Sequence, residues 1–140
     1  MKTVTFAQAQ TIVNAALAYA REKNFKPLGV AVLDVRGALT AYGAEDGSSL
    51  GRAQIAMGKA SGAIGMGLGS RAIATRPPQF TNAVGQLLLY GMVPVPGGVL
   101  IKDGSETVGA VGISGDASEN DEAAALAGIK AAGLTGDTGE

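Results

Sequence analysis

The spacing of apolar and polar residues predicts a helix near each end of the chain. Thr5-Phe6-Ala7-Gln8 fits a capping box, in which the threonine hydroxyl and the glutamine side chain each satisfy an exposed backbone amide. Apolar residues then recur at helical spacing, which predicts a helix over residues 5–23. Near the other end, Ser118 can cap a helix that runs to about residue 132, and the acidic residues after it favour a helix start.

Two apolar hairpins are predicted between these helices. Residues 28–35 are apolar on both faces, as in a strand that is covered on both sides, and Arg36-Gly37 turns the chain into a return strand over 38–43. A turn at Asp103-Gly104 indicates the second hairpin. Its extended parts are predicted at residues 93–96, 98–102 and 107–114.

A long run of small residues lies between the hairpins and predicts a helix over 51–69. Its glycines occur in pairs four residues apart, and each costs a helix about 1 kcal/mol relative to alanine. This cost indicates that another backbone approaches closely, either that of the sheet or that of a partner subunit. The two prolines after Arg76 end this region, and a short helix follows over 80–90.

This order of elements predicts a single α/β (α+β) domain with a mainly antiparallel sheet flanked by helices. We expect the domain to span residues 1–132 and residues 133–140 to form a flexible tail. A chain of 140 residues is long enough to bury its own core.

The composition excludes several classes of function. The chain has neither cysteine nor histidine, which excludes disulfides, a Ser-His-Asp triad and histidine-ligated zinc. Its net charge of −1 favours neither nucleic acid nor an anionic membrane as a partner. No apolar run reaches the ~20 residues of a membrane span, and the first residues do not resemble a signal peptide, so we expect a cytoplasmic protein.

Three short motifs have structural explanations. The glycines of residues 65–69 resemble a phosphate-binding loop, but a helix rather than a strand is predicted before them, which favours close helix packing. The alternating oxygens of residues 116–122 resemble a calcium loop without its glycine, so helix capping is favoured and no metal site is predicted. Ser114 could act as a nucleophile only with lysine as its base, and a turn serine is the simpler interpretation.

The charges are distributed unevenly along the chain. No acidic residue lies between Asp46 and Asp103, whereas six acids follow within the next twenty positions. Either the basic and acidic residues pair across the fold, or some basic residues line a pocket for an anionic group. For the second interpretation, the candidate cations and backbone donors are Arg52, Lys59, Arg76, Gly97 and Gly98.

Two longer segments resemble a known family. The run Val93–Gly104, with its Pro-Gly-Gly, and the run Val108–Glu122 are similar to the signature of the GlcG/HbpS family, which includes the C-terminal domain of PduO-type proteins. The segments Asp34–Leu39, Glu45–Gly47 and Arg52–Ala60 fall where that family has its hairpin and its Lys-Ala helix. The resemblance extends in order from Phe6 to Ile129.

The resemblance implies a sheet of about five antiparallel strands in a profilin-like layering, and homo-oligomers of up to eight subunits. It also implies binding of haem or a related small molecule, or an accessory role in organic-acid and diol catabolism. Haem binding in the family is attributed to histidine, which this chain lacks. Apart from lysine, the remaining axial-ligand candidates are Met57, Met66, Met92, Tyr19, Tyr42 and Tyr90.

Three functions therefore remain open. The first is a binding module for a small anionic metabolite, located at a subunit interface. The second is an isomerase or lyase for an organic acid, with Lys59 and either Asp116 or Asp121 as proton carriers. The third is a haem carrier or sensor without histidine ligation.

Overall fold

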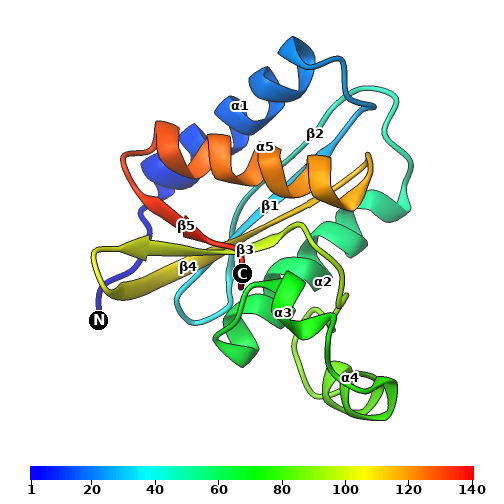
Figure 1. Cartoon of the computed structure of the whole chain (residues 1–140). Coiled ribbons are helices and arrows are strands. Elements are labelled where there is room, and N and C mark those ends of the chain that lie inside the picture. Colours follow the sequence, from blue (N-terminus) through cyan, green and yellow to red (C-terminus); the bar gives the residue numbers. More distant parts are fainter.

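A five-stranded antiparallel sheet separates two layers of helices in the computed structural model, which describes residues 1–140 (Figure 1). The strand order is β2-β1-β4-β3-β5. The strands are β1 (Gly29–Asp34), β2 (Leu39–Ala44), β3 (Gly98–Asp103), β4 (Glu106–Ser114) and β5 (Thr135–Asp137). The helices are α1 (Phe6–Glu22), α2 (Gly51–Met66), α3 (Ser70–Ile73), α4 (Pro78–Gly85) and α5 (Ser118–Ala131). No helix is both long and apolar enough to span a bilayer.

The predicted α+β class, the five strands and both hairpins are confirmed. The capping box at the start of α1 is also present: the Thr5 hydroxyl accepts from the Gln8 amide at 3.1 Å, and the Gln8 side chain accepts from the Thr5 amide at 2.9 Å. β1 lies between β2 and β4 and is buried along its whole length, which explains why its sequence is apolar on both faces.

The structure differs from the sequence predictions in several places, and α2 ends at Met66 rather than at residue 69. Residues 93–96 form no strand, and α4 ends at Gly85 rather than near residue 90. Ser118 is not a side-chain cap: α5 begins after Ala117, whose amide donates to the Asp116 carboxylate at 2.7 Å.

The predicted flexible tail is instead largely ordered as part of the sheet. Thr135–Asp137 forms β5 and pairs with β3, because Gly136 lets the chain pass close over the side chains of Val99 and Leu126. Thr138 then packs directly on Gly69.

The two faces of the sheet bury cores of different size. The larger core lies under α1 and α5 and contains branched residues of the sheet such as Val30, Val111 and Ile113. The smaller core lies under α2 and is built largely from alanines and leucines. Its buried members are Leu33, Ala60, Ala63, Leu100 and Ala110.

Glycines explain how α2 lies so close to the sheet. A Cβ on Gly112 would collide with the carbonyl oxygen of Ala56, and a Cβ on Gly98 would collide with that of Lys59. The helix backbone therefore rests directly on β3 and β4. The sequence predicted close approach of either the sheet or a partner subunit, and on this side of the helix the neighbour is the sheet.

The glycine stripe on the other side of α2 contacts the chain itself. A Cβ on Gly58, Gly62 or Gly65 would lie 2.7–3.1 Å from the side chains of Val93, Met92 or Leu88. Residues 88–93 of the same chain therefore cover this glycine surface. The sequence had left open that a partner subunit would cover it.

We expect Gly112→Ala to destabilise the domain strongly, because the added methyl group meets helix backbone rather than a movable side chain. Overpacking of this kind costs about 1–3 kcal/mol or more, measurable by chemical denaturation. Gly51→Ala is the matched control: nothing lies within 4 Å of its new Cβ, and a helical alanine should leave stability equal or about 1 kcal/mol higher. Equal losses in both variants would contradict the close packing of α2.

Candidate functional site

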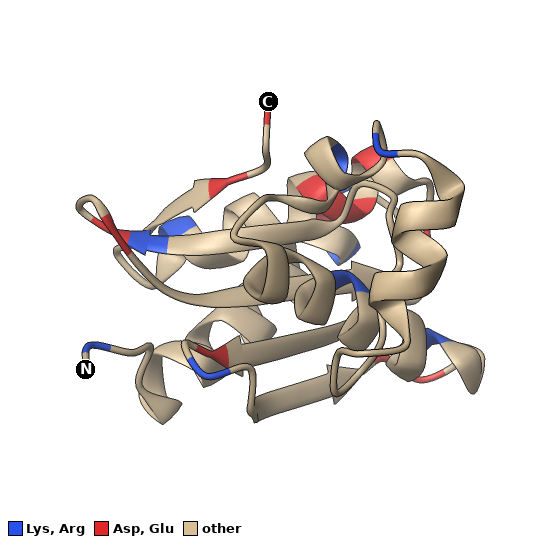
Figure 2. Ribbon diagram, turned by 90° about the horizontal axis from the view of Figure 1, so that it is seen from below, with Lys and Arg blue, Asp and Glu red and all other residues tan.

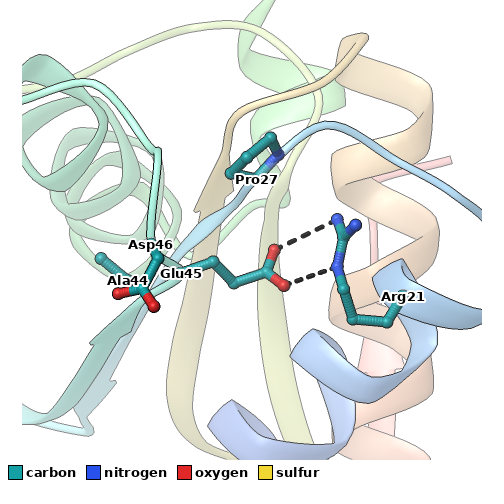
Figure 3. A pocket seen from close by; sticks show the side chains of 5 residues that line it. All are labelled: Arg21, Pro27, Ala44, Glu45 and Asp46. Atoms are coloured by element: carbon teal, nitrogen blue, oxygen red, sulfur yellow. Dashed lines mark hydrogen bonds and ion pairs between the residues drawn. The ribbon is translucent and has the colours of Figure 1, made fainter.

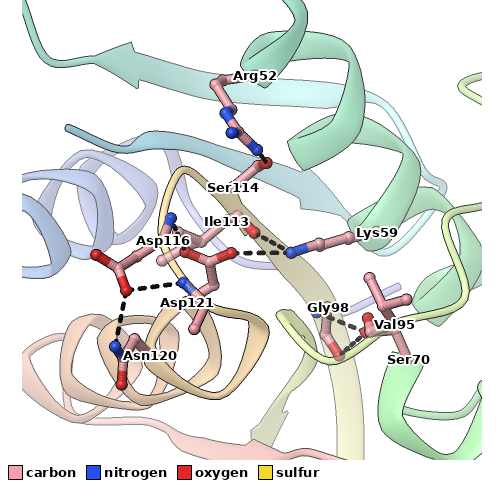
Figure 4. Close-up of polar contacts among 11 residues, drawn as sticks. Arg52, Lys59, Ser70, Val95, Gly98, Ile113, Ser114, Asp116, Asn120 and Asp121 are labelled. Atoms are coloured by element: carbon pink, nitrogen blue, oxygen red, sulfur yellow. Dashed lines mark hydrogen bonds and ion pairs between the residues drawn. The ribbon is translucent and has the colours of Figure 1, made fainter. Parts of the chain in front are cut away.

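A buried ion pair between Lys59 of α2 and Asp121 of α5 lies at the centre of the polar region (Figure 4). The Lys59 Nζ donates to Asp121 Oδ2 at 3.0 Å and to the carbonyl oxygen of Ile113 at 2.8 Å. The two side chains are only 3% and 1% exposed. The pair therefore ties α2 to the start of α5 at the end of β4.

Burial dominates the electrostatics of this pair. It lowers the pKa of Lys59 and raises the pKa of Asp121, and in each case the attraction of the partner opposes the shift without reversing it. The nearby Arg52 charge lowers the pKa of Lys59 further. Both groups are closed to solvent, so the geometry describes a structural connection and not an accessible proton carrier.

Asp116, the other predicted proton carrier, holds the turn before α5. Its carboxylate accepts from the side chain of Asn120 at 2.7 Å (Figure 4). It also accepts from the amide of Lys26 at 2.7 Å and from the amide of Ala117. These hydrogen bonds, that of Lys26 first, lower the pKa of Asp116. A carboxylate with a lowered pKa is a weak base at neutral pH.

The Gly97-Gly98 turn is packed beside Lys59. A Cβ on Gly97 would lie 2.8 Å from the Lys59 Nζ, and the φ of Gly97 is +122°, which favours glycine. The Gly98 amide, predicted as a ligand donor, already donates to the Ser70 hydroxyl at 2.7 Å. Ser70 in turn donates to the carbonyl oxygen of Val95 at 2.5 Å (Figure 4).

The two predicted arginines lie in different environments. Arg52, in the first turn of α2, is half-buried, and its Nη1 donates to the Ser114 hydroxyl at 3.1 Å (Figure 4). No acidic side chain pairs with Arg52, and the other N–H groups of its guanidinium have no acceptor in the chain. Arg76 is exposed between α3 and α4 and makes no side-chain hydrogen bond or ion pair.

The structure thus brings together some of the predicted ligand-binding residues and not others. Lys59, Gly97 and Gly98 meet in the interior, with Arg52 nearby, whereas no contact joins Arg76 to them. The expected concave pocket, in which Lys59 and Arg76 both face a ligand, is not formed within the chain because the charge of Lys59 is paired with Asp121. The sequence could not reveal this pairing, since the partners lie 62 positions apart.

Pairing across the fold explains much of the uneven charge distribution (Figure 2). Besides Lys59, Arg71 forms a bidentate pair with Glu122, with N–O distances of 2.9 and 3.1 Å. Lys2 pairs with Asp103 at the surface, at 2.9 Å. Three of the six acids of residues 103–122 thus neutralise basic residues from distant parts of the chain.

The one surface hollow lies elsewhere and is open to solvent (Figure 3). Its volume is about 480 Å³, and two of its three charged side chains are paired with each other. The Nε of Arg21 lies 2.6 Å from Glu45 Oε2, and Glu45 Oε1 accepts from the Leu28 amide at 2.9 Å. None of the predicted site residues lines this hollow. Its lining residues are Arg21, Pro27, Ala44, Glu45 and Asp46.

The layers and the strand order define a small α+β protein with a helix-covered antiparallel sheet. Residues 4–130 match the family model described as haem degrading protein HbpS-like. The chain belongs to this HbpS-like family, which confirms the resemblance found in the sequence. No curated protein sequence matches the chain significantly.

Solved structures share the fold at low sequence identity. The ORFY protein of Klebsiella pneumoniae is 22% identical, with a TM-score of 0.83 over 95% of this chain and 92% of its own. PduOC, solved in complex with haem, is 21% identical, with a TM-score of 0.83 over 94% and 96% of the two chains. A double mutant of HbpS from Streptomyces reticuli is 24% identical, with a TM-score of 0.81 over 93% and 87%.

The residues of this chain do not fit a haem held by an axial protein ligand. The chain has no histidine or cysteine, and the single hollow contains none of its methionines or tyrosines. Tyr42 is further disfavoured as a ligand because burial raises the pKa of its hydroxyl, whereas iron binds the phenolate. Tyr42 instead lies close to Arg52. The sequence analysis did not predict that these two residues are neighbours.

We expect Lys59→Met and Asp121→Leu to destabilise the domain separately, because each leaves one buried charge without its partner. Such losses are about 3–5 kcal/mol, measurable by chemical denaturation. The double variant should recover most of this loss, since burial costs both charges more than their attraction returns. A double variant as unstable as the sum of the single variants would show that the two residues do not act as a pair.

Proposed function

We propose that this chain binds a small anionic molecule and that Arg52 is the recognition group. The observation that carries the proposal is a half-buried guanidinium with one hydroxyl partner and no acidic partner. Its neighbour Lys59 is neutralised by Asp121, so Arg52 supplies the uncompensated charge of this region. A partly desolvated guanidinium without a counter-ion favours an anion that supplies one.

The family supports a small molecule as the ligand. The chain belongs to the HbpS-like family, and the structure of PduOC contains haem. Because the sequence resembles the GlcG/HbpS signature, we further propose that the protein acts in or near an organic-acid catabolic pathway. An anionic metabolite agrees with both the family and the charge of Arg52.

We expect Arg52→Gln to weaken the binding of small anions by about ten- to a hundredfold, because a charge-assisted hydrogen bond contributes about 1.5–3 kcal/mol. Amide chemical shifts recorded against a panel of carboxylates and phosphates would measure the effect. Arg76→Gln is the matched control and should leave affinity unchanged, since that side chain is exposed and contacts no member of the site. Equal effects of the two substitutions would refute the role of Arg52.

Haem is a second candidate, favoured by the family description and by the haem complex of PduOC. We expect the purified protein to carry no haem and to bind added haemin weakly, because the chain lacks the strong axial ligands. An absorption spectrum tests this directly. A sharp Soret band at one haemin per chain, lost on replacement of a single Tyr or Met, would contradict the expectation.

The isomerase or lyase alternative has no comparable support. Its proposed proton carriers Lys59 and Asp121 are bonded to each other in the interior, and Asp116 is held by three hydrogen bonds. A substrate would have to open the connection between α2 and α5 to reach them.

We further propose that the protein acts as a homo-oligomer that associates through the segment after α4. The α4 region projects from the body of the domain (Figure 1). Leu88 packs on α2, while its neighbours Leu87 and Leu89 are 81% and 77% exposed. Leucines held outward in this way are typical of a surface that another protein covers. The resemblance of the sequence to the GlcG/HbpS family implies that the oligomer contains at most eight subunits.

We expect Leu87→Asp to reduce the mass measured by light scattering, because a carboxylate would be buried at the interface. Gln10→Asp is the matched control: it adds the same charge at an exposed position of α1, outside the proposed interface, and should leave the assembly intact. A wild-type protein that is monomeric at every concentration would contradict the proposal.

A further inference from the structure

Three side chains from different elements meet on the α2 face of the sheet above Gly29. In the antiparallel register Gly29 pairs with Ser114, and Ala31 pairs with Tyr42. Gly29 and Ala31 are two residues apart and share a face, so Ser114 and Tyr42 point to that same face. Arg52 reaches it from α2 and is fixed there by its hydrogen bond to Ser114 (Figure 4).

Gly29 forms the floor beneath these groups. A Cβ at this position would lie 2.8 Å from the Tyr42 hydroxyl and 3.5 Å from the Arg52 Cβ. The missing side chain is therefore what lets the phenol lean across β1 toward the arginine. The position of the hydroxyl depends on glycine at residue 29.

The Tyr42 hydroxyl is available as a donor. No hydrogen bond to the protein engages it, and the residue as a whole is 37% exposed. Burial raises the pKa of Tyr42, which keeps the hydroxyl protonated at neutral pH. Beside it, the Arg52 groups other than the Nη1 bond to Ser114 have no acceptor in the chain.

The charge of the cluster selects among anions. It contains one uncompensated positive charge and two neutral hydroxyls, because Lys59 is already paired with Asp121. A planar guanidinium fork matches the two oxygens of a carboxylate, and the single charge balances a single negative charge. A phosphate dianion would leave one charge unbalanced.

We propose that Arg52 and Tyr42 form a carboxylate-binding site above Gly29, with Ser114 holding the guanidinium in place. This inference rests on the proposed function and makes it specific: the ligand presents a monoanionic carboxylate to the fork of Arg52, and the Tyr42 hydroxyl donates to one carboxylate oxygen. Tyr42, Gly29 and Ser114 thereby join the site beside Arg52.

The test is an amide chemical-shift titration with acetate and, separately, with inorganic phosphate at mildly alkaline pH, where phosphate is a dianion. We expect acetate to bind wild-type protein with a dissociation constant of about a millimolar and more tightly than phosphate. Tyr42→Phe should weaken acetate binding by about two- to tenfold, the effect of one hydrogen bond. Arg52→Gln should abolish it within the range of the titration.

Gly29→Ala tests the floor without removing a polar group. Its methyl group meets the free end of the Tyr42 side chain, which can move, so the variant should fold normally and still bind acetate more weakly. Gly51→Ala, one residue from Arg52 and with nothing near its Cβ, is the matched control and should bind as wild type does. Should Gly29→Ala fail to fold, Tyr42→Phe decides the question alone.

The outcomes separate this inference from the function on which it rests. Tighter binding of phosphate than of acetate, or an unchanged acetate affinity in Tyr42→Phe, overturns the carboxylate site; the proposed function stands if Arg52→Gln still abolishes binding. No binding of either anion to the wild-type protein, or binding that ignores Arg52→Gln, overturns both.

Discussion

The direct contact between the α2 backbone and the sheet is the constraint on which the other features depend. Gly112 and Gly98 bring the helix onto β4 and β3 at a distance that no side chain would allow. This approach brings Lys59 within reach of the Ile113 carbonyl and Arg52 within reach of Ser114. A helix held farther away by ordinary side chains would make neither contact.

The same closeness makes the Lys59–Asp121 pair necessary. A lysine that leaves the inner side of a helix so near the sheet cannot reach solvent, and its charge needs a partner in the interior. Asp121, in the first turn of α5, supplies that partner, and its carboxylate also accepts from the Asp116 amide at 3.0 Å. One buried pair therefore joins the two helical layers around the end of β4, and its role in this chain is structural.

Neutralisation of Lys59 determines which charge remains for function. Arg71 and Arg21 are paired with acids as well, so Arg52 is the arginine that combines partial burial with the lack of a counter-ion. The hydroxyls of Ser114 and Tyr42 lie beside it, and the nearby charge of Lys59 is balanced by Asp121. This makes the region suited to a small anion, and it does not provide the axial ligand that haem requires.

The sequence by itself determined the elements of the fold and the chemistry that is impossible. Periodicity and turn residues predicted both hairpins and the long helices, and the family signature predicted the layered sheet, because these features are local or are written in contiguous motifs. The absence of histidine and cysteine excluded whole classes of site. The sequence also indicated a close backbone approach to α2, since so many helical glycines need a reason.

Only the tertiary structure decided which charges are free. Lys59 and Asp121 were predicted as functional groups because burial and long-range pairing leave no trace in local sequence, and their partnership spans 62 positions. The role of residues 135–137 was missed for a similar reason: three mostly polar residues become a strand only because the edge of β3 is there to pair with. Tyr42 approaches Arg52 only through strand register and the missing side chain of Gly29, and both are properties of the assembled sheet.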